Sequence, residues 1–91
     1  MELRWTEVAA TDLERIGEFL LEETPYHGSR LVSEIFEASQ VLLQFPYRGR
    51  PGRKVGTREL VLPSLPYLVI YTVSDDTIHV VRILHGAQKY P

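Results

Sequence analysis

The sequence predicts an α+β domain in which a pair of helices packs on a small antiparallel β-sheet, in the order β-α-α-β-β-β. Two observations lead to this prediction. Apolar residues recur at helical spacing through the first half of the chain. The second half instead holds short β-branched and aromatic runs separated by turn residues. With 91 residues the chain is long enough for one core, so we expect a single domain over residues 1–91.

The first elements are a short strand and an amphipathic helix. Residues 1–5 are β-capable and predict a strand at an edge of the sheet. In residues 6–24 charged side chains take one side, and the other side carries Ala9, Leu13, Ile16 and Leu20. Thr6 is the expected N-cap of this helix, and Pro25 ends it.

A second helix is predicted over residues 26–45. Its apolar stripe consists of Leu31, Ile35, Ala38 and Leu42. Ser29 is a candidate N-cap, and Pro46 marks the end. Only a few residues separate the two helices, so they should form an antiparallel hairpin.

The remainder predicts one loop and three strands. Residues 47–56 contain three glycines, one proline and no hydrophobic periodicity, which is typical of a loop. Strands are predicted over residues 57–63, 66–73 and 77–85, with turns at 64–66 and 74–76. The middle strand is apolar on both faces, so we expect it at the centre of the sheet.

Charge is distributed unevenly along the chain. The net charge is −2, but residues 1–45 hold nine acidic and three basic residues, whereas residues 46–91 hold three acidic and seven basic ones. This division indicates a surface for an anionic partner, although a solvated basic loop would give the same pattern. The candidate anion-binding residues are Arg48, Arg50, Arg53, Lys54, Arg58, Arg82 and Lys89.

Several classes of chemistry lack their sequence signals. The chain has no cysteine, and its three histidines lack chelating spacing, so we expect neither a metal site nor a cofactor. No nucleophile elbow or P-loop is present. Nothing in the sequence predicts a membrane span or a signal peptide, and a cytoplasmic location is expected.

Arg82 is the most informative candidate because it interrupts an apolar strand. Strand alternation places it on the same face as Ile78, Val80 and Leu84. There it either forms a salt bridge with Glu59 on a neighbouring strand or clamps a phosphate or carboxylate group.

Together with Arg82, three more residues could perform metal-independent RNA cleavage. Arg58 would help to hold the phosphate, while His85 or Tyr90 would transfer protons. The alternative is structural: His85 caps the last strand and Tyr90 covers an edge of the core.

The chain as a whole resembles the RelE/ParE superfamily, the toxin halves of bacterial type II toxin–antitoxin modules. "AATDLERIGEFLLEE" resembles the first helix of these toxins, and "SRLVSEIFEASQVLLQFPYRGRPG" resembles the second helix with its following loop. "GTRELVLPSLPYLVIYTVSDDTIHVVRILHGAQKYP" resembles their C-terminal sheet. The resemblance implies a cognate antitoxin as partner, held in a hetero-oligomeric complex.

Two activities are implied within the superfamily. ParE-type members poison DNA gyrase without being nucleases, and the ending "VVRILHG" is more similar to theirs. RelE-type members are ribosome-dependent mRNA endoribonucleases, often with an arginine after the last strand, where this chain has Gly86. We therefore expect a ParE-like gyrase inhibitor, with the ribonuclease using Arg58, Arg82, His85 and Tyr90 as the alternative.

Overall fold

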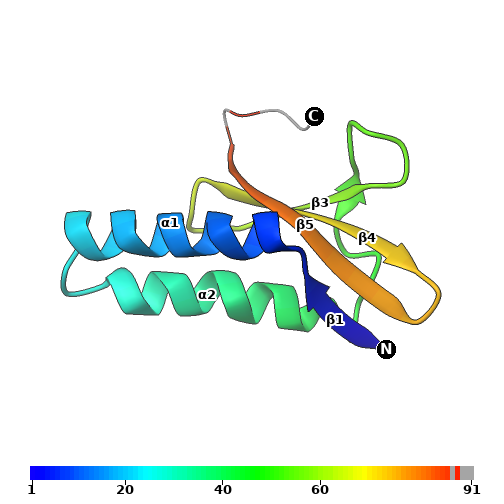
Figure 1. The fold of residues 1–91 in the computed structure, drawn as a ribbon, viewed down its shortest axis with the longest axis horizontal. Helices are drawn as coiled ribbons and strands as arrows, with labels where there is room; N and C mark the ends of the chain where they lie inside the picture. The colour runs from blue at the N-terminus through cyan, green and yellow to red at the C-terminus, as the bar shows by residue number, and fades with distance from the viewer. Residues whose placement is uncertain (87, 89–91) are drawn as a thin grey trace.

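Two helices lie against one face of a five-stranded sheet (Figure 1). The structure is a computed structural model that describes residues 1–86 and residue 88. In chain order the elements are β1 (Glu2–Trp5), α1 (Glu7–Glu23), α2 (Gly28–Val41), β2 (Arg50–Pro51), β3 (Arg58–Val61), β4 (Tyr67–Ser74) and β5 (Thr77–His85). The predicted α+β class with a helical hairpin on a small sheet is confirmed.

The sheet is mixed rather than antiparallel. Its strand order is β1-β5-β4-β3-β2. The strands from β2 to β5 pair antiparallel, but β1 pairs parallel to β5, with Leu3 opposite Ile78. Parallel neighbours need a long connection, and the helical hairpin with the next three strands supplies it. The loop predicted over residues 47–56 also contributes the two-residue strand β2.

The start of α1 agrees with the prediction from the sequence. Thr6 has an extended backbone (φ −69°, ψ 160°), and its hydroxyl oxygen accepts a hydrogen bond from the backbone N–H of Ala9 at 3.1 Å. The last turn closes where the backbone N–H of Thr24 donates to the carbonyl of Leu20 at 2.8 Å. Thr6 is therefore confirmed as the N-cap.

The expectation that Ser29 caps the second helix was wrong. The N-cap is His27, which makes no side-chain capping bond, and α2 begins at Gly28. A Cβ atom at Gly28 would lie 2.8 Å from the carbonyl oxygen of Leu20, so the close approach of the two helices fixes this position. The helix also ends earlier than predicted, at Val41, because residues 42–44 form tighter i→i−3 bonds before Pro46.

The core lies between the helices and the sheet. Its fully buried members come from both helices, from the residue after α2 and from the central strands: Ala9, Ile35, Leu42, Val69, Tyr71, Ile78 and Val80. Among the described residues, no helix combines the length and the apolar character that a membrane crossing requires.

A β-bulge in β5 changes which residues face this core. Tyr71 pairs with Val80 but the preceding Ile70 pairs with Arg82, so Val81 is an extra residue on β5. Ile83 therefore joins Val80 in the core, whereas Arg82 pairs with Ile70 and lies outside the core cluster, with its guanidinium at the strand edge beside α1. The prediction that Arg82 shares a face with Ile78 and Val80 was wrong, because an extra residue reverses the alternation.

Candidate functional site

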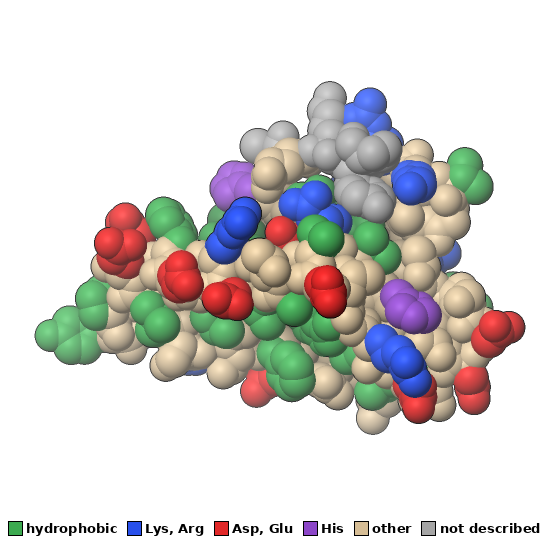
Figure 2. Space-filling model, viewed as in Figure 1, with side chains coloured by type: hydrophobic (Ala, Val, Ile, Leu, Met, Phe, Trp, Pro, Cys, Tyr) green, Lys and Arg blue, Asp and Glu red, His purple; other side chains and the backbone are tan. Residues whose placement is uncertain are grey.

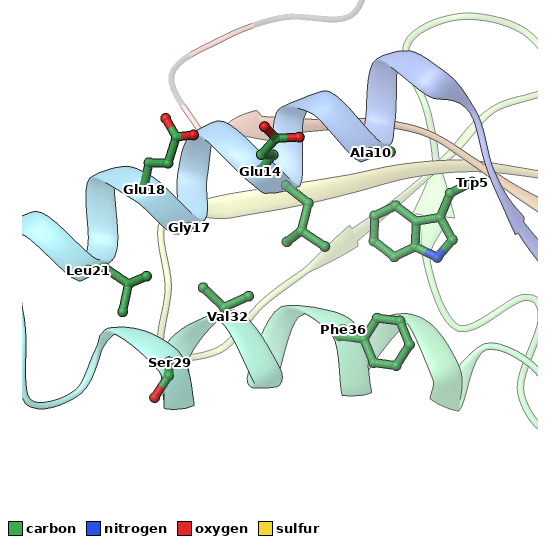
Figure 3. Close-up of a pocket in the computed structure, with 10 residues that line it drawn as sticks. Trp5, Ala10, Glu14, Gly17, Glu18, Leu21, Ser29, Val32 and Phe36 are labelled. Atoms are coloured by element: carbon green, nitrogen blue, oxygen red, sulfur yellow. The ribbon is translucent and has the colours of Figure 1, made fainter.

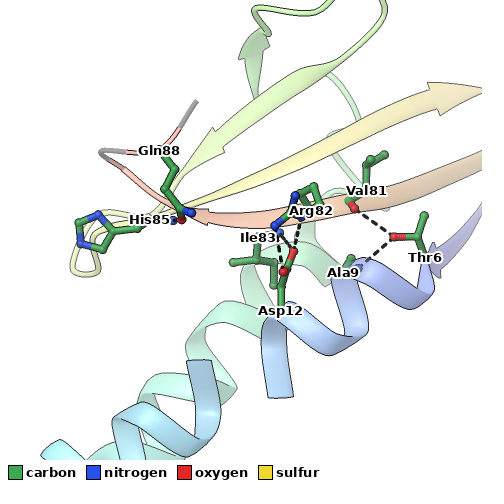
Figure 4. Close-up of polar contacts among 8 residues, drawn as sticks. All are labelled: Thr6, Ala9, Asp12, Val81, Arg82, Ile83, His85 and Gln88. Atoms are coloured by element: carbon green, nitrogen blue, oxygen red, sulfur yellow. Dashed lines mark hydrogen bonds and ion pairs between the residues drawn. The ribbon is translucent and has the colours of Figure 1, made fainter. Parts of the chain in front are cut away.

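Arg82 is bound to helix α1 (Figure 4). Its Nε donates to Oδ2 of Asp12 at 2.7 Å, and a second guanidinium nitrogen donates to Oδ1 at 3.2 Å. The expected partner, Glu59, instead accepts from Nε of Arg50 at 3.0 Å. The predicted Arg82–Glu59 salt bridge is therefore corrected to an Arg82–Asp12 pair that joins the sheet to a helix.

The same helix covers an exposed edge of β5. Strand β1 ends opposite Val80, and beyond that point no other strand among the described residues lies along the outer edge of β5. The hydroxyl of Thr6 donates to the carbonyl of Val81 at 3.0 Å, and the backbone N–H of Ile83 donates to Asp12 at 3.0 Å (Figure 4). Asp12 thus serves both Arg82 and the strand edge, which gives the ion pair a structural role.

Arg58 binds the turn that follows α2. Its Nε donates to the carbonyl of Gly49 at 2.9 Å, and a terminal nitrogen donates to the carbonyl of Tyr47 at 3.3 Å. The guanidinium carbon lies 5.3 Å from the centre of the Tyr47 ring, within cation–π range. Arg58 therefore fixes a protein loop with the donors that were predicted to hold phosphate.

Tyr71 fixes the same turn from its position in the sheet, a role that was not predicted from the sequence. It is fully buried on β4, and its hydroxyl donates to the carbonyl of Pro46 at 2.7 Å and accepts from the N–H of Gly49 at 2.9 Å. A tyrosine in a strand predicted to be buried needs a hydrogen-bond partner for its hydroxyl, and this requirement could have identified Tyr71 from the sequence. We call residues 45–48 the aromatic turn, because Phe45 and Tyr47 are held exposed there.

His85 lies at the far end of β5. Its backbone N–H donates to the side chain of Gln88 at 2.7 Å, and its ring meets the Tyr67 ring edge-on with centroids 5.9 Å apart. In Figure 4 the imidazole points away from Arg82. The predicted residues Lys89 and Tyr90 lie outside the described residues.

The described members of the predicted ribonuclease set do not meet at one point. Arg58 pairs with Tyr71 in the register, whereas His85 pairs with Tyr67. Four residues of strand separate these positions, a distance of about 13 Å. Arg82 is held beside α1 at the edge of β5 by Asp12, and β4 lies between β5 and the strand of Arg58. A single phosphate could not contact all three without rearrangement of the strands.

The predicted basic surface is divided into separate parts. Arg50 and Arg53 line a shallow depression of about 410 Å³ that also includes Gly86 and Gln88, so they lie beside the C-terminal segment. Arg48 instead borders a depression of about 530 Å³ at the aromatic turn. Figure 2 shows acidic side chains along the helices and most of the visible basic ones toward the upper edge of the view.

An apolar depression runs between the two helices (Figure 3). This interhelical groove has a volume of about 580 Å³ and is lined by Trp5, Ala10, Leu13, Glu14, Gly17, Glu18, Leu21, Ser29, Val32 and Phe36. The Trp5 ring stacks on Phe36 with centroids 6.3 Å apart at one end. Glu14 and Glu18 place carboxylates along its α1 side, and the rest of the lining is mainly apolar. Such a surface suits an amphipathic partner segment.

Burial raises the pKa of Tyr67 above its ordinary value of 10.0. As the pH rises, the Tyr67 hydroxyl therefore loses its proton in the unfolded chain before it does so in the folded protein. The contribution of this group to the unfolding free energy is complete below pH 10 and declines above it. We expect the Tyr67→Phe variant to show a shallower loss of unfolding free energy between pH 9 and 11, measured by urea denaturation. Equal slopes for the variant and the wild type would contradict this assignment.

Comparison with known proteins agrees with the geometry. The family described as "ParE toxin of type II toxin-antitoxin system, parDE" matches residues 3–90. "Putative toxin Y4kP" of Sinorhizobium fredii is 37% identical over 89 residues, covering 98% of this chain and 92% of that protein. "Toxin RelE2" of Caulobacter vibrioides is 34% identical over 84 residues, covering 92% of this chain and 93% of that protein.

A solved structure shares the whole arrangement. The "Chromosomal ParDE TA system from P. aeruginosa" contains a chain with a TM-score of 0.86 and 31% identity, over 93% of this chain and 95% of that one. A helical hairpin on this mixed sheet, with these relatives, defines a toxin of the RelE/ParE superfamily. Within that superfamily, the chain belongs to the ParE toxin family of type II toxin–antitoxin systems.

Proposed function

We propose that this toxin arrests growth by inhibiting DNA gyrase in the cytoplasm and that a cognate antitoxin neutralises it. Membership of the ParE family supports a protein-directed toxin. The dispersal of Arg58, Arg82 and His85 is the observation that favours this action over RNA cleavage. Both arginines already serve structural contacts, so a phosphate would have to compete with them.

The interhelical groove is the proposed seat of the antitoxin. An amphipathic helix could insert its apolar stripe between α1 and α2 and contact Trp5 and Phe36. Glu14 and Glu18 favour basic residues at the border of that stripe. The basic residues from Arg48 to Arg58 would attract an acidic tail of the antitoxin.

Ribosome-dependent mRNA cleavage is the alternative. Its support comes from relatives named RelE, such as "Toxin RelE2" at 34% identity. In that case His85 and Tyr90 would transfer protons, and Arg58 and Arg82 would steady the phosphate only after leaving their present partners.

Purified components distinguish the two activities. The toxin is incubated with DNA gyrase and supercoiled plasmid, and in parallel with ribosomes programmed with mRNA. We expect trapped gyrase–DNA cleavage complexes, intact mRNA and unchanged gyrase trapping by the His85→Ala variant. Cleavage of mRNA in the ribosomal A site, lost in His85→Ala and without an effect on gyrase, would replace this proposal by the alternative.

A further inference from the structure

We propose that the aromatic turn, residues 45–48, is the surface with which the toxin engages its target protein. Phe45 and Tyr47 would enter an apolar pocket on the target, and Arg48 would face a carboxylate at its border. This inference depends on the proposed function in one respect: the target is a protein. It goes further by naming the surface used and the chemistry that the partner must present.

The backbone of the turn is held in one conformation. Tyr71 binds the carbonyl of Pro46 and the N–H of Gly49, while Arg58 binds the carbonyls of Tyr47 and Gly49. The N–H of Arg48 closes the turn on the carbonyl of Phe45 at 3.1 Å. A Cβ atom at Gly49 would lie 2.7 Å from the Tyr71 ring, so the loop packs directly on the sheet. A loop fixed in this way loses little conformational freedom on binding.

The turn nevertheless presents large aromatic side chains to solvent. Phe45 is 56% exposed and Tyr47 is 67% exposed. The depression beside them is bordered by Gln44, Pro46 and Arg48, and its lining is mainly apolar. Rigid aromatic residues next to an arginine are the residues that dominate binding energy in protein interfaces. Exposed apolar side chains gathered at one place often mark an interaction site.

Charge determines what kind of partner fits. Arg48 borders the depression at the turn and the Arg58 guanidinium lies over the Tyr47 ring, so the charged side chains that contact the turn are positive. A second copy of this chain would bring two positive surfaces together, so self-association is disfavoured. Nucleic acid is a weaker candidate, because the Arg58 guanidinium already covers one face of the Tyr47 ring. An acidic protein surface with an apolar pocket fits both features.

The aromatic turn and the interhelical groove share no lining residue. The groove is built from Trp5, α1 and α2, whereas the turn follows the end of α2. Substitutions in the turn should therefore affect target engagement and leave antitoxin binding intact. This separation makes the proposal testable without knowing the target in advance.

The test uses the Phe45→Ser/Tyr47→Ser double variant of the full chain. The matched control is Tyr26→Ser/Val55→Ser, which removes an aromatic and an aliphatic side chain that are 95% and 97% exposed. Each is assayed for growth arrest after graded induction, for trapping of gyrase–DNA complexes, and for affinity toward the cognate antitoxin. Thermal unfolding verifies that both variants are folded.

We expect the turn variant to need at least about 30-fold more toxin for growth arrest and gyrase trapping, the typical effect of removing a hot-spot residue. Antitoxin affinity should stay within about threefold of wild type, and the control should behave as wild type. Undiminished growth arrest by the turn variant would overturn the proposal, as would an equal loss of antitoxin affinity. The gyrase proposal fails separately if the wild-type toxin arrests growth without trapping gyrase. In that case the growth assay alone still tests whether the turn engages the target.

Discussion

The Asp12→Ala variant is expected to lose about 3 kcal/mol of unfolding free energy, because one carboxylate serves three hydrogen bonds between α1 and β5. The Asp12 side chain is only 12% exposed, and its removal leaves the N–H of Ile83 without this acceptor. The Arg82 side chain is 33% exposed, so water partly compensates its loss, and the effect should fall at the lower end for a broken ion pair.

Two further variants separate charge from hydrogen bonding. Asp12→Asn keeps an oxygen acceptor for Ile83 but removes the charge, and we expect a loss of about 1–2 kcal/mol. Glu18→Ala, an exposed carboxylate on the same helix, serves as the control and should change stability by less than about 0.5 kcal/mol. Urea denaturation gives the free energies, and hydrogen exchange at the Ile83 amide reports the local effect. If Asp12→Ala matched the control, the contact would not stabilise the fold.

The elements that depend on local chemistry were predictable from the sequence. Two features identify α1: the helical spacing of its apolar residues and the hydroxyl of Thr6 at its start. Both involve residues close together in the chain, so both can be recognised in the sequence. The start of α2 was not predictable in this way. Ser29 has the right side chain for a cap, but α2 begins at Gly28, where the backbone approaches Leu20 of the preceding helix too closely for a side chain.

The position of Arg82 shows where alternation fails. Its neighbours Val80, Val81 and Ile83 are all apolar and β-branched, so the sequence does not identify which residue forms the bulge. The bulge is located by the pairing of β5 with β4 and by the contacts of Thr6 and Asp12 with the strand edge. Thr6 and Asp12 are distant from β5 in the chain, so the sequence around Arg82 does not reveal them. Interpretations of a strand arginine therefore depend on register as much as on residue type.

The candidate site was only partly predictable for the same reason. The glycine-rich segment after α2 was correctly expected to be largely irregular, and its basic residues were read as one anion-binding surface. The structure instead uses Arg58 to bind Gly49 and Tyr47, and Arg50 to bind Glu59. Hydrogen bonds from side chains to backbone carbonyls leave no pattern in the sequence, because every residue has a backbone carbonyl that can accept one.

Removal of the Tyr71 hydroxyl is expected to weaken both the fold and the function of the aromatic turn. Tyr71→Phe keeps the buried ring but leaves the N–H of Gly49 and the carbonyl of Pro46 without their shared partner. Because Gly49 and Tyr71 are buried, we expect a loss of about 2 kcal/mol in unfolding free energy, measured by urea denaturation. Tyr67→Phe, the same change at another buried position of β4, is the control at neutral pH.

The functional effect follows from preorganisation rather than from lost contacts. Tyr71→Phe leaves the side chains of Phe45, Tyr47 and Arg48 in the chain. If these side chains alone determined binding, the variant would engage its target as well as the wild type. If the turn must be rigid, loosening its backbone should raise the toxin concentration needed for growth arrest by about tenfold, while antitoxin affinity stays near wild type. A folded Tyr71→Phe toxin with wild-type potency would mean that the turn binds its target without needing these two hydrogen bonds, and Arg58 alone would then suffice to hold it.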